Sequence, residues 1–428
     1  MFFFDTFIIV FYFHNYLCNM SSDESFKNTT ITQASLRNLF LAHVGQTSEA
    51  PLALHITKAK GTKMWDAAGK EYIDLIGGIS VCNIGHCHPQ VVEAIKKQAD
   101  EYLHIMVYGE LIESPQVHYA KLITENLPAS LNSVFFTASG AEATEGAMKL
   151  AKRVTGRTQI VSFNNSYHGS TQGALSIMGS EYWQQSYRPL LPDILQLRYN
   201  NLEDVEKITA QTACVFAETI QAEAGVIVPK NNWLYRLRQK CNETGALLVL
   251  DEIQCGFGRN GSLWAFEQFN IVPDILLLGK ALGGGMPMGA FIADKNLMNS
   301  LTHNPVLGHI NTFGGHPVSC AAGMAAMKVL IAENLPAKVA AKEKLFRKLL
   351  LHSKIKKINS RGLMMAVFFE DFAKNKKIID ACIAQGIFTD WFLFAPEALR
   401  IAPPLNISEE EIEVACGKIF DVLNRDDL

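Results

Sequence analysis

The chain has 428 residues, of which 48% are hydrophobic, so it is long enough for two domains or for one large α/β domain with a smaller one. Its 39 basic and 42 acidic side chains give a formal charge of -3, which excludes the basic surface typical of nucleic-acid binding and favours small-molecule chemistry. Nine cysteines without a paired framework indicate reduced thiols, so we expect a cytoplasmic protein.

The chain begins with a strongly apolar stretch, MFFFDTFIIVFYFHNYLC. It contains Asp5, has no basic residues before its apolar part, and is short for a membrane span. A signal anchor and an extension upstream of a true start at Met20 are the two alternatives, and we favour the extension. Residues 20–33 are rich in Ser, Thr, Asp and Asn. We therefore interpret residues 1–33 as a leader outside the fold and expect no membrane association.

The predicted elements begin with a β-hairpin in KMWDAAGKEYIDL, whose turn lies at residues 67–69. From about residue 90 to residue 330, helical patterns such as QVVEAIKKQADEYL alternate with short apolar runs. These runs are SVFFTA, TQIVSF, ACVFAE, ALLVLDE and DILLLG. Such alternation predicts an α/β fold in which helices cover a mostly parallel sheet.

The last hundred residues change character. They contain a candidate strand in GLMMAVFF, a candidate helix near residues 375–384, an extended piece in ALRIAP, and a final helix. Ser408 and Glu411 form the sequence pattern of a capping box at the start of that final helix. We predict a large domain at residues 77–318 and a smaller α+β domain made of residues 34–76 and 319–428.

A lysine directly follows one of the predicted strands. Lys280 follows DILLLG and precedes Gly283, Gly284 and Gly285. A lysine in this place is usually a surface residue that ends a strand. However, ligands of open α/β sheets bind at the carboxyl ends of the strands, where desolvation lowers the pKa of an amine. A lysine so placed can form a Schiff base.

Two more strand ends carry candidate chemistry. Asp251 and Gln254 follow ALLVL, and a buried carboxylate there needs either a capping role or a cation, such as the protonated nitrogen of a pyridine ring. Ser139, Gly140 and Ala141 lie where the first N–H groups of a helix would point at an anion. Together, an anion cradle, an acid and a lysine indicate one cofactor site.

Two other motifs have weaker interpretations. GFGRNG, residues 256–261, matches G-x-G-x-x-G, but no obvious helix follows it, so an NAD-dependent dehydrogenase is a distant alternative. CNIGHCHP brings together Cys82, His86, Cys87 and His88, yet adjacent ligands rarely fit one tetrahedron, and we expect no metal site. A non-catalytic binding protein is the remaining alternative.

Six segments occur in a familiar order. They are SGAEATEGAMKLAK, YHGS, ETIQAEAGVIVP, LLVLDEIQCGFGRNG, DILLLGKALGGGMPMGA and NTFGGHPVSCAA. From about residue 35 onward the chain resembles the class-III aminotransferases of the acetylornithine, ornithine and 4-aminobutyrate type. The resemblance implies PLP fold type I, pyridoxal 5'-phosphate as cofactor, and a homodimer with shared active sites. It also implies ping-pong transfer of an amino group from a small-molecule donor to a 2-oxo acid, with 2-oxoglutarate favoured.

The resemblance further implies roles for single residues in the cofactor site. Lys280 matches the lysine that forms a Schiff base with the cofactor, Asp251 the aspartate bonded to the pyridine nitrogen, and Gln254 the neighbour of the ring hydroxyl. Gly140 and Ala141 match the backbone groups that bind the phosphate.

Other matched residues concern the ring, the partner subunit and the substrate. Tyr167 matches the aromatic residue that stacks on the ring, and Thr312 matches the threonine that reaches the phosphate in the other subunit. Glu218 matches a glutamate that pairs with an arginine near the C-terminus, here Arg400. Such a pair would let one pocket accept both a substrate carboxylate and an ω-amine, although an ordinary salt bridge is the alternative.

The donor stays open because of one departure from the family pattern. Ser170 stands where many relatives have an arginine that binds the distal carboxylate of the donor. Acetylornithine or ornithine is our first expectation, and 4-aminobutyrate or another ω-amine the next. A decarboxylase or an aminomutase of the same fold is a further alternative.

Overall fold

The structure, a computed structural model, describes residues 33–426, so most of the predicted leader lies outside the described residues. The described chain divides into two compact units. The first contains residues up to Thr57 together with residues 66–68, and its helix α2 spans Gln33–His43. The second contains residues 58–65 and everything from Gly69 onward, including all the elements that form the candidate site.

The second unit is built on a seven-stranded sheet with the strand order β4-β10-β9-β8-β7-β5-β6. In that order the strands are Ser133–Thr137, Gly289–Ala293, Ile275–Gly279, Leu247–Asp251, Thr212–Glu218, Gln159–Phe163 and Ile194–Leu197. Five of these strands, namely β4, β5, β7, β8 and β9, confirm the strands predicted from the apolar runs, whereas β6 and β10 were not predicted. The sheet is mostly parallel, as expected, and β10 runs antiparallel to both of its neighbours.

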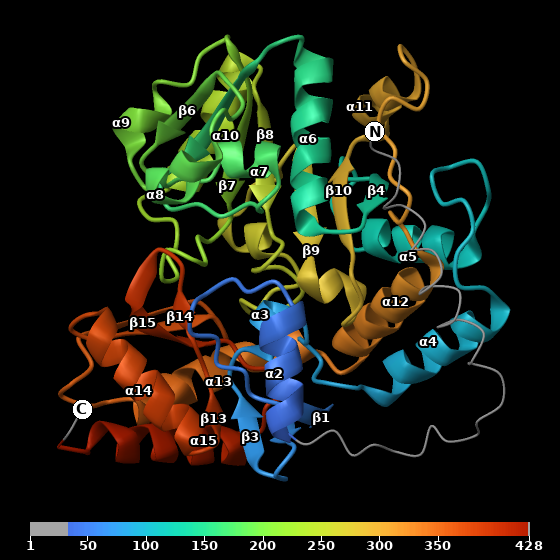
Figure 1. Cartoon of the computed structure of the whole chain (residues 1–428). Helices are drawn as coiled ribbons and strands as arrows, with labels where there is room; N and C mark the ends of the chain where they lie inside the picture. The colour runs from blue at the N-terminus through green and yellow to red at the C-terminus, as the bar shows by residue number, and fades with distance from the viewer. Residues whose placement is uncertain (1–32, 427–428) are drawn as a thin grey trace, which may run out of the picture. The chain divides into compact units, whose positions relative to one another are not determined.

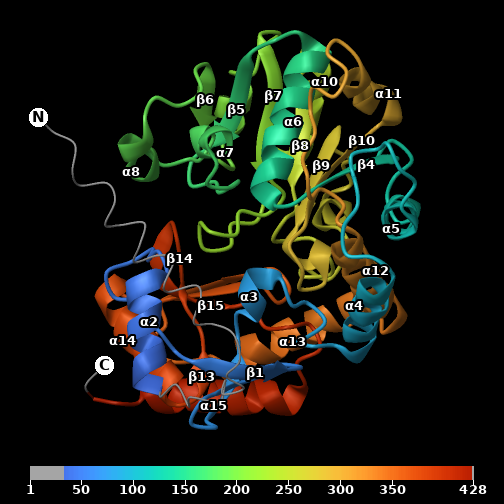
Figure 2. The same cartoon turned by 45° about the vertical axis from the view of Figure 1, so that its right-hand side comes forward.

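Helices cover both faces of this sheet (Figures 1 and 2). On one face, α6 (Gly140–Thr155) packs Ala147 and Ala151 into a core cluster with Ile275 and Leu277 of β9. On the other face, Leu276 and Leu278 belong to a second cluster, which includes residues of α10 (Trp233–Thr244) and α12 (Pro317–Ala332). Both faces of β9 are buried, which explains why its sequence is a continuous apolar run.

Two smaller sheets accompany the large one. The first has the order β1-β2-β3-β13, with bounds Ile56–Lys60, Lys63–Asp66, Glu71–Asp74 and Ile387–Phe388. The second has the order β11-β12-β15-β14, with bounds Lys357–Ser360, Met365–Phe368, Ala395–Ile401 and Trp391–Phe392. The antiparallel pair β2 and β3 confirms the predicted hairpin. The proposed domain boundaries at residues 77 and 318 stay a prediction.

The C-terminal helices follow their capping signals. α14 (Phe372–Ala384) begins earlier than predicted because the Asp371 side chain accepts a hydrogen bond from the Lys374 N–H. α15 (Glu409–Leu423) has the predicted capping box of Ser408 and Glu411. The other α-helices are α3 (Gly77–Ser80), α4 (Pro89–Glu101), α5 (Ser114–Glu125), α7 (Gln172–Ser176), α8 (Glu181–Gln184), α9 (Leu202–Val205), α11 (Lys295–Met298) and α13 (Leu335–Leu349). The 3-10 helices are η1 (Gln185–Tyr187), η2 (Ala265–Phe269), η3 (Lys280–Gly283) and η4 (Asn299–Thr302).

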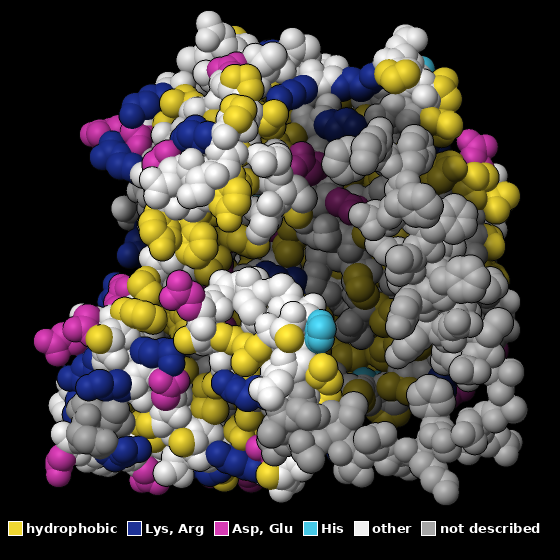
Figure 3. All heavy atoms as spheres, in the orientation of Figure 1, with side chains coloured by type: hydrophobic (Ala, Val, Ile, Leu, Met, Phe, Trp, Pro, Cys, Tyr) yellow, Lys and Arg dark blue, Asp and Glu magenta, His cyan; other side chains and the backbone are white. Residues whose placement is uncertain are grey.

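Two further features concern the apolar helices and the distribution of surface charge. Among the described helices, none taken singly is long and apolar enough to cross a membrane; only α12 with α13, bent by 68° where they join, meets that criterion by length and composition. On the face drawn in Figure 3, basic and acidic side chains of the described residues lie interspersed. This pattern agrees with the balanced formal charge of the sequence.

Candidate functional site

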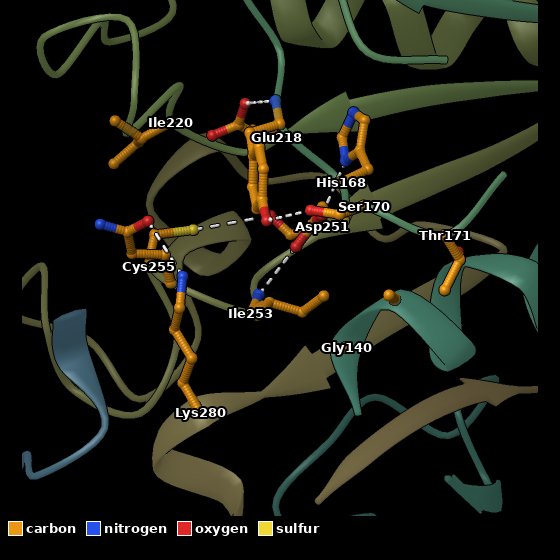
Figure 4. Close-up of a pocket in the computed structure, with 14 residues that line it drawn as sticks. Gly140, His168, Ser170, Thr171, Glu218, Ile220, Asp251, Ile253, Cys255 and Lys280 are labelled. Atoms are coloured by element: carbon orange, nitrogen blue, oxygen red, sulfur yellow. Dashed lines mark hydrogen bonds and ion pairs between the residues drawn. The ribbon is translucent and has the colours of Figure 1, made fainter. Parts of the chain in front are cut away.

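The carboxyl ends of three neighbouring strands meet at one cavity. β7 ends at Glu218 and β8 at Asp251, which lie opposite each other in register, and Lys280 directly follows β9. The cavity has a volume of about 450 Å³, and Figure 4 shows these side chains around it. Gly140, Ala141, Tyr167 and Gln254 also line it, so seven of the predicted site residues come together.

Lys280 lies at the floor of this cavity in an unusual backbone conformation. Its φ is 48°, in the left-handed region that non-glycine residues rarely adopt, and such strain often marks functional sites. Its Nζ donates a hydrogen bond to Gln254 Oε1 over 3.1 Å. Burial lowers the pKa of Lys280, and the charges of Glu223 and Asp251 oppose this effect. The amine is therefore closer to its neutral, reactive form than an exposed lysine would be.

Asp251 is held by two neighbours. Its Oδ2 lies 2.7 Å from Nδ1 of His168, and its Oδ1 accepts the Ile253 N–H at 2.9 Å. Burial alone would lower the pKa of His168, but the hydrogen bond and charge of Asp251 outweigh it and the pKa is raised. The hydrogen bond with His168 and the Ile253 N–H together fix the orientation of the Asp251 carboxylate. Sequence reasoning missed His168, although it follows Tyr167 in the YHGS segment.

The amino end of α6 forms another wall of the cavity. Ser139 is the N-cap, and its hydroxyl accepts the Glu142 N–H, so its side chain serves the helix and does not line the cavity. Gly140 and Ala141 occupy the first helical turn, where N–H groups have no partner inside the helix. An added Cβ at Gly140 would lie 2.9 Å from the Ile253 side chain, so any larger residue there would force Ile253 to shift.

Glu218 anchors the segment that carries Tyr167. Its two carboxylate oxygens accept the N–H groups of Tyr167 at 3.1 Å and Ala222 at 2.8 Å. Burial raises the pKa of Glu218 to about 7. The Tyr167 hydroxyl lies 3.1 Å from the hydroxyl of Ser170, the residue that departs from the family pattern.

The predicted pairing of Glu218 with Arg400 is wrong. Arg400 Nη1 and Nη2 donate to the two oxygens of Glu223 over 2.8 and 3.0 Å. Both glutamates belong to the segment ETIQAEAG, but Glu218 ends β7 at the sheet, whereas Glu223 lies in the turn beyond it. The turn carries Glu223 toward β15, where Arg400 lies, while backbone N–H groups occupy both oxygens of Glu218.

Arg400 has a second acidic partner that the sequence did not indicate. Its Nε donates to Asp390 Oδ1 over 2.7 Å. Burial raises the pKa of Asp390, Arg400 opposes this effect, and the like charge of Glu223 adds to it. The bidentate contact with Arg400 instead holds the pKa of Glu223 below its usual range despite burial. These residues line a second cavity of about 520 Å³, which shares Tyr167 and Lys280 with the first.

The remaining candidates lie elsewhere. Thr312 is exposed and lines neither cavity. Within the described residues no group of three His, Cys, Asp or Glu side chains could hold a metal ion, and His86 instead contacts Asp74 at 2.7 Å. GFGRNG forms turns and opens no helix, and the buried Arg259 in it donates to the carbonyl of Leu363. This geometry does not favour the dinucleotide alternative.

Comparison with known proteins gives matches along most of the chain. A family model described as aminotransferase class-III matches residues 44–423. An acetylornithine aminotransferase of Methanopyrus kandleri is 39% identical over 386 residues, which cover 89% of this chain and 96% of the relative. Another from Clostridium acetobutylicum is 38% identical over 376 residues, covering 85% and 94%.

Solved structures agree with these matches. An ornithine aminotransferase of Toxoplasma gondii, described with PLP at its active site, superposes with a TM-score of 0.85 at 30% identity, covering 91% of this chain and 94% of the other. An omega-transaminase of Thermomicrobium roseum gives a TM-score of 0.84 at 26% identity, covering 91% and 98%.

Proposed function

Because the chain belongs to the class-III aminotransferases, which are PLP-dependent transaminases of fold type I, we propose that the cavity at Lys280 is its active site. The observation that carries this proposal is the meeting of Lys280, Asp251 and the amino end of α6 around one cavity. These are a nucleophilic amine, a carboxylate and an anion site, which a pyridine aldehyde with a phosphate requires.

The residues around the cavity fit pyridoxal 5'-phosphate. Gly140 and Ala141 offer backbone N–H groups at the start of a 16-residue helix, a favourable place for the phosphate, and Ser139 caps the same turn. The Gln254 Nε2 is buried without a hydrogen-bond partner, so it is a ready donor to the ring hydroxyl. The ring of Tyr167 lines the same cavity and supplies a flat surface for stacking.

When bound, the cofactor supplies a protonated ring that accepts the electrons left on the substrate carbon. Asp251, held by His168 and the Ile253 N–H, would hold the ring nitrogen and favour its protonated form. Lys280 Nζ, made less basic by burial, would serve as the base that removes the proton from the substrate carbon and as the acid that holds it. Gln254 Oε1 orients the Nζ for this transfer.

Substrate binding uses the second cavity. Arg400 binds the carboxylate of a 2-oxo acid, with 2-oxoglutarate as the favoured acceptor, when Glu223 gives up its bidentate contact. Glu218 shapes the wall beside Tyr167 and does not contact Arg400. Relatives named acetylornithine aminotransferase make acetylornithine and ornithine the first donors to test, with 4-aminobutyrate and other ω-amines next.

The active unit in this proposal is a homodimer with shared active sites. Large apolar side chains are exposed around Ile112, which is 93% exposed, and along the segment that contains Thr312. The exposed set comprises Leu103, Ile105, Met106, Leu111, Ile112, Val117, Val306, Leu307, Ile310 and Phe313. Exposed apolar groups in this number suit an interface with a second copy. The cysteines of the described residues are all free, which supports a reducing, cytoplasmic location.

The first test is the substitution Lys280→Ala, with Lys295→Ala, an exposed lysine, as the control. We expect Lys280→Ala to lower amino transfer by roughly a thousandfold or more, because the chain loses its base and nucleophile. Pyridoxal 5'-phosphate should still bind, as followed by fluorescence quenching. Activity is scored as glutamate formed from 2-oxoglutarate against a panel of amines. Substantial transfer by Lys280→Ala would contradict the assignment.

The same assay separates the alternatives. Carbon dioxide release would indicate a decarboxylase, and product formed without any 2-oxo acid would indicate an aminomutase. Reduction of NAD by the purified protein would indicate a dehydrogenase. Lys295→Ala should match the unaltered protein in each measurement.

A further inference from the structure

Arg400 is bound by two carboxylates that come from different parts of the chain. Glu223 lies in the turn after β7, whereas Asp390 directly precedes β14 and pairs through its backbone carbonyl with the Arg400 N–H at 2.9 Å. Glu223 binds Nη1 and Nη2, and Asp390 binds Nε. The two acids therefore occupy different edges of one guanidinium.

The edge that Glu223 occupies is the one that a substrate carboxylate would need. Two parallel hydrogen bonds from Nη1 and Nη2 are the geometry in which arginine grips a carboxylate, so Glu223 competes directly with a substrate. Asp390 does not compete with a substrate carboxylate, because it binds Nε and not the edge formed by Nη1 and Nη2. Asp390 can keep its hydrogen bond to Arg400 when Glu223 leaves.

Further contacts hold the Asp390 edge in place. The carbonyl of Trp391 accepts a hydrogen bond from Nη2 at 3.0 Å, and the ring of Phe392 lies 4.2 Å from the guanidinium carbon. The Thr389 hydroxyl donates to the Arg400 carbonyl at 2.6 Å. Residues 389–392 thus form one support along β15, and Glu223 is the only carboxylate partner of Arg400 in the described residues that comes from outside it.

We propose that Asp390 is a positioning and specificity residue that holds Arg400 in place while Glu223 yields to a substrate carboxylate. This inference rests on the proposed function. The negative charge of Asp390 acts alike on Glu223 and on a substrate carboxylate that takes the same edge, so the hydrogen bond from Nε to Asp390, and not the charge, fixes how that edge is presented.

The test compares two substitutions at one position. Asp390→Asn keeps an oxygen that accepts from Nε but removes the charge, and Asp390→Ala removes both. The probe is glutarate, an unreactive dicarboxylate, titrated into the holoenzyme by calorimetry, together with KM for 2-oxoglutarate. We expect Asp390→Ala to raise both constants by roughly tenfold, since Arg400 is then free to move, and Asp390→Asn, which keeps the acceptor for Nε, to change them clearly less.

Asp380→Asn provides the matched control, because Asp380 pairs with Lys376 on the exposed face of α14. Equal constants in all variants, or changes of the same size in both Asp390 variants, would overturn the inference. So would an active unaltered holoenzyme that does not bind glutarate. Failure of the proposed function is a separate result, namely an unaltered protein that forms no glutamate with any amine.

Discussion

His86 lies outside the proposed active site but joins separate segments of the chain. Its Nε2 lies 2.7 Å from Asp74 Oδ2, and its backbone exchanges two hydrogen bonds with Gly61. The hydrogen bond with Asp74 is the main cause that raises the pKa of His86 to about 10, and burial opposes it. His86 is therefore a charged structural residue, which leaves it unsuited to bind a metal ion.

This raised pKa predicts a pH dependence of stability. Because the folded pKa of about 10 exceeds the ordinary value of 6.5, the contribution of His86 is fully present below about pH 6.5 and is lost as the pH rises through 10. We expect the unfolding free energy to fall by roughly 2 kcal/mol across that pH window because of His86. This is less than the whole pKa shift would give, because the side chain is partly exposed. His86→Gln should lose this part of the slope in urea unfolding at pH 6, 7.5 and 9. The control His43→Gln, at an exposed position, should keep it; equal slopes in the two variants would contradict the prediction.

At the scale of elements, the predictions were correct where the local sequence pattern by itself determines the secondary structure. The continuous apolar runs became the buried strands β4, β5, β7, β8 and β9, and the Ser408 pattern became the cap of α15. β6 was missed because ILQL has only four residues, and β10 because GAFIA begins with glycine and continues the glycine-rich segment after Lys280. Their pairing in the sheet, and not their composition, makes them strands.

In the candidate site, too, residues marked by a local sequence pattern were predicted, and residues that depend on tertiary contacts were missed. Lys280, Asp251 and Gly140 could be identified because each follows or opens a recognisable element. The partner of Arg400 could not be, because two glutamates in one segment differ only in how far the turn after β7 carries them. His168 acts through a contact with a distant segment, and Asp390 through a contact between the paired strands β14 and β15, and no local pattern indicates either contact.

One close approach between elements positions the lysine. Gly323 of α12 lies against the Leu282 carbonyl of η3, the short helix that begins at Lys280, and against the ring of Tyr119. The Tyr119 hydroxyl donates to the same carbonyl over 2.6 Å. A side chain at position 323 would push η3 away from α12, and with it the backbone of Lys280.

We therefore predict opposite effects for alanine at two helical glycines. Gly323→Ala should destabilise the protein by roughly 2 kcal/mol through overpacking and should weaken cofactor binding. Gly417→Ala in α15, where an added Cβ meets nothing within 4 Å, should stabilise it by about 0.5 to 1 kcal/mol, because alanine favours the helix. Urea unfolding and titration with pyridoxal 5'-phosphate measure both effects. If the two variants behaved alike, the proposed contact between α12 and η3 would lose its role.

At the scale of the whole molecule, one chain provides most of the proposed site and leaves one predicted residue unused. Thr312 is exposed, lines neither cavity, and lies in a segment whose large apolar side chains Val306, Leu307, Ile310 and Phe313 are also exposed. A second copy that covers this segment would remove the apolar surface from water and could bring Thr312 to the cofactor phosphate of the partner.

Mixed dimers test whether Thr312 serves the other subunit. Lys280→Ala inactivates the site of its own chain, and Thr312→Glu would place a negative charge beside the phosphate bound by the partner. In a mixed dimer of these two chains, one site then carries both defects and the other carries neither. Co-expression of both chains in equal amounts should restore about a quarter of the unaltered activity, since half of the dimers are mixed and each holds one intact site. If Thr312 served its own chain, every site in the mixture would carry a defect, and glutamate formation would stay at the level of the separate variants.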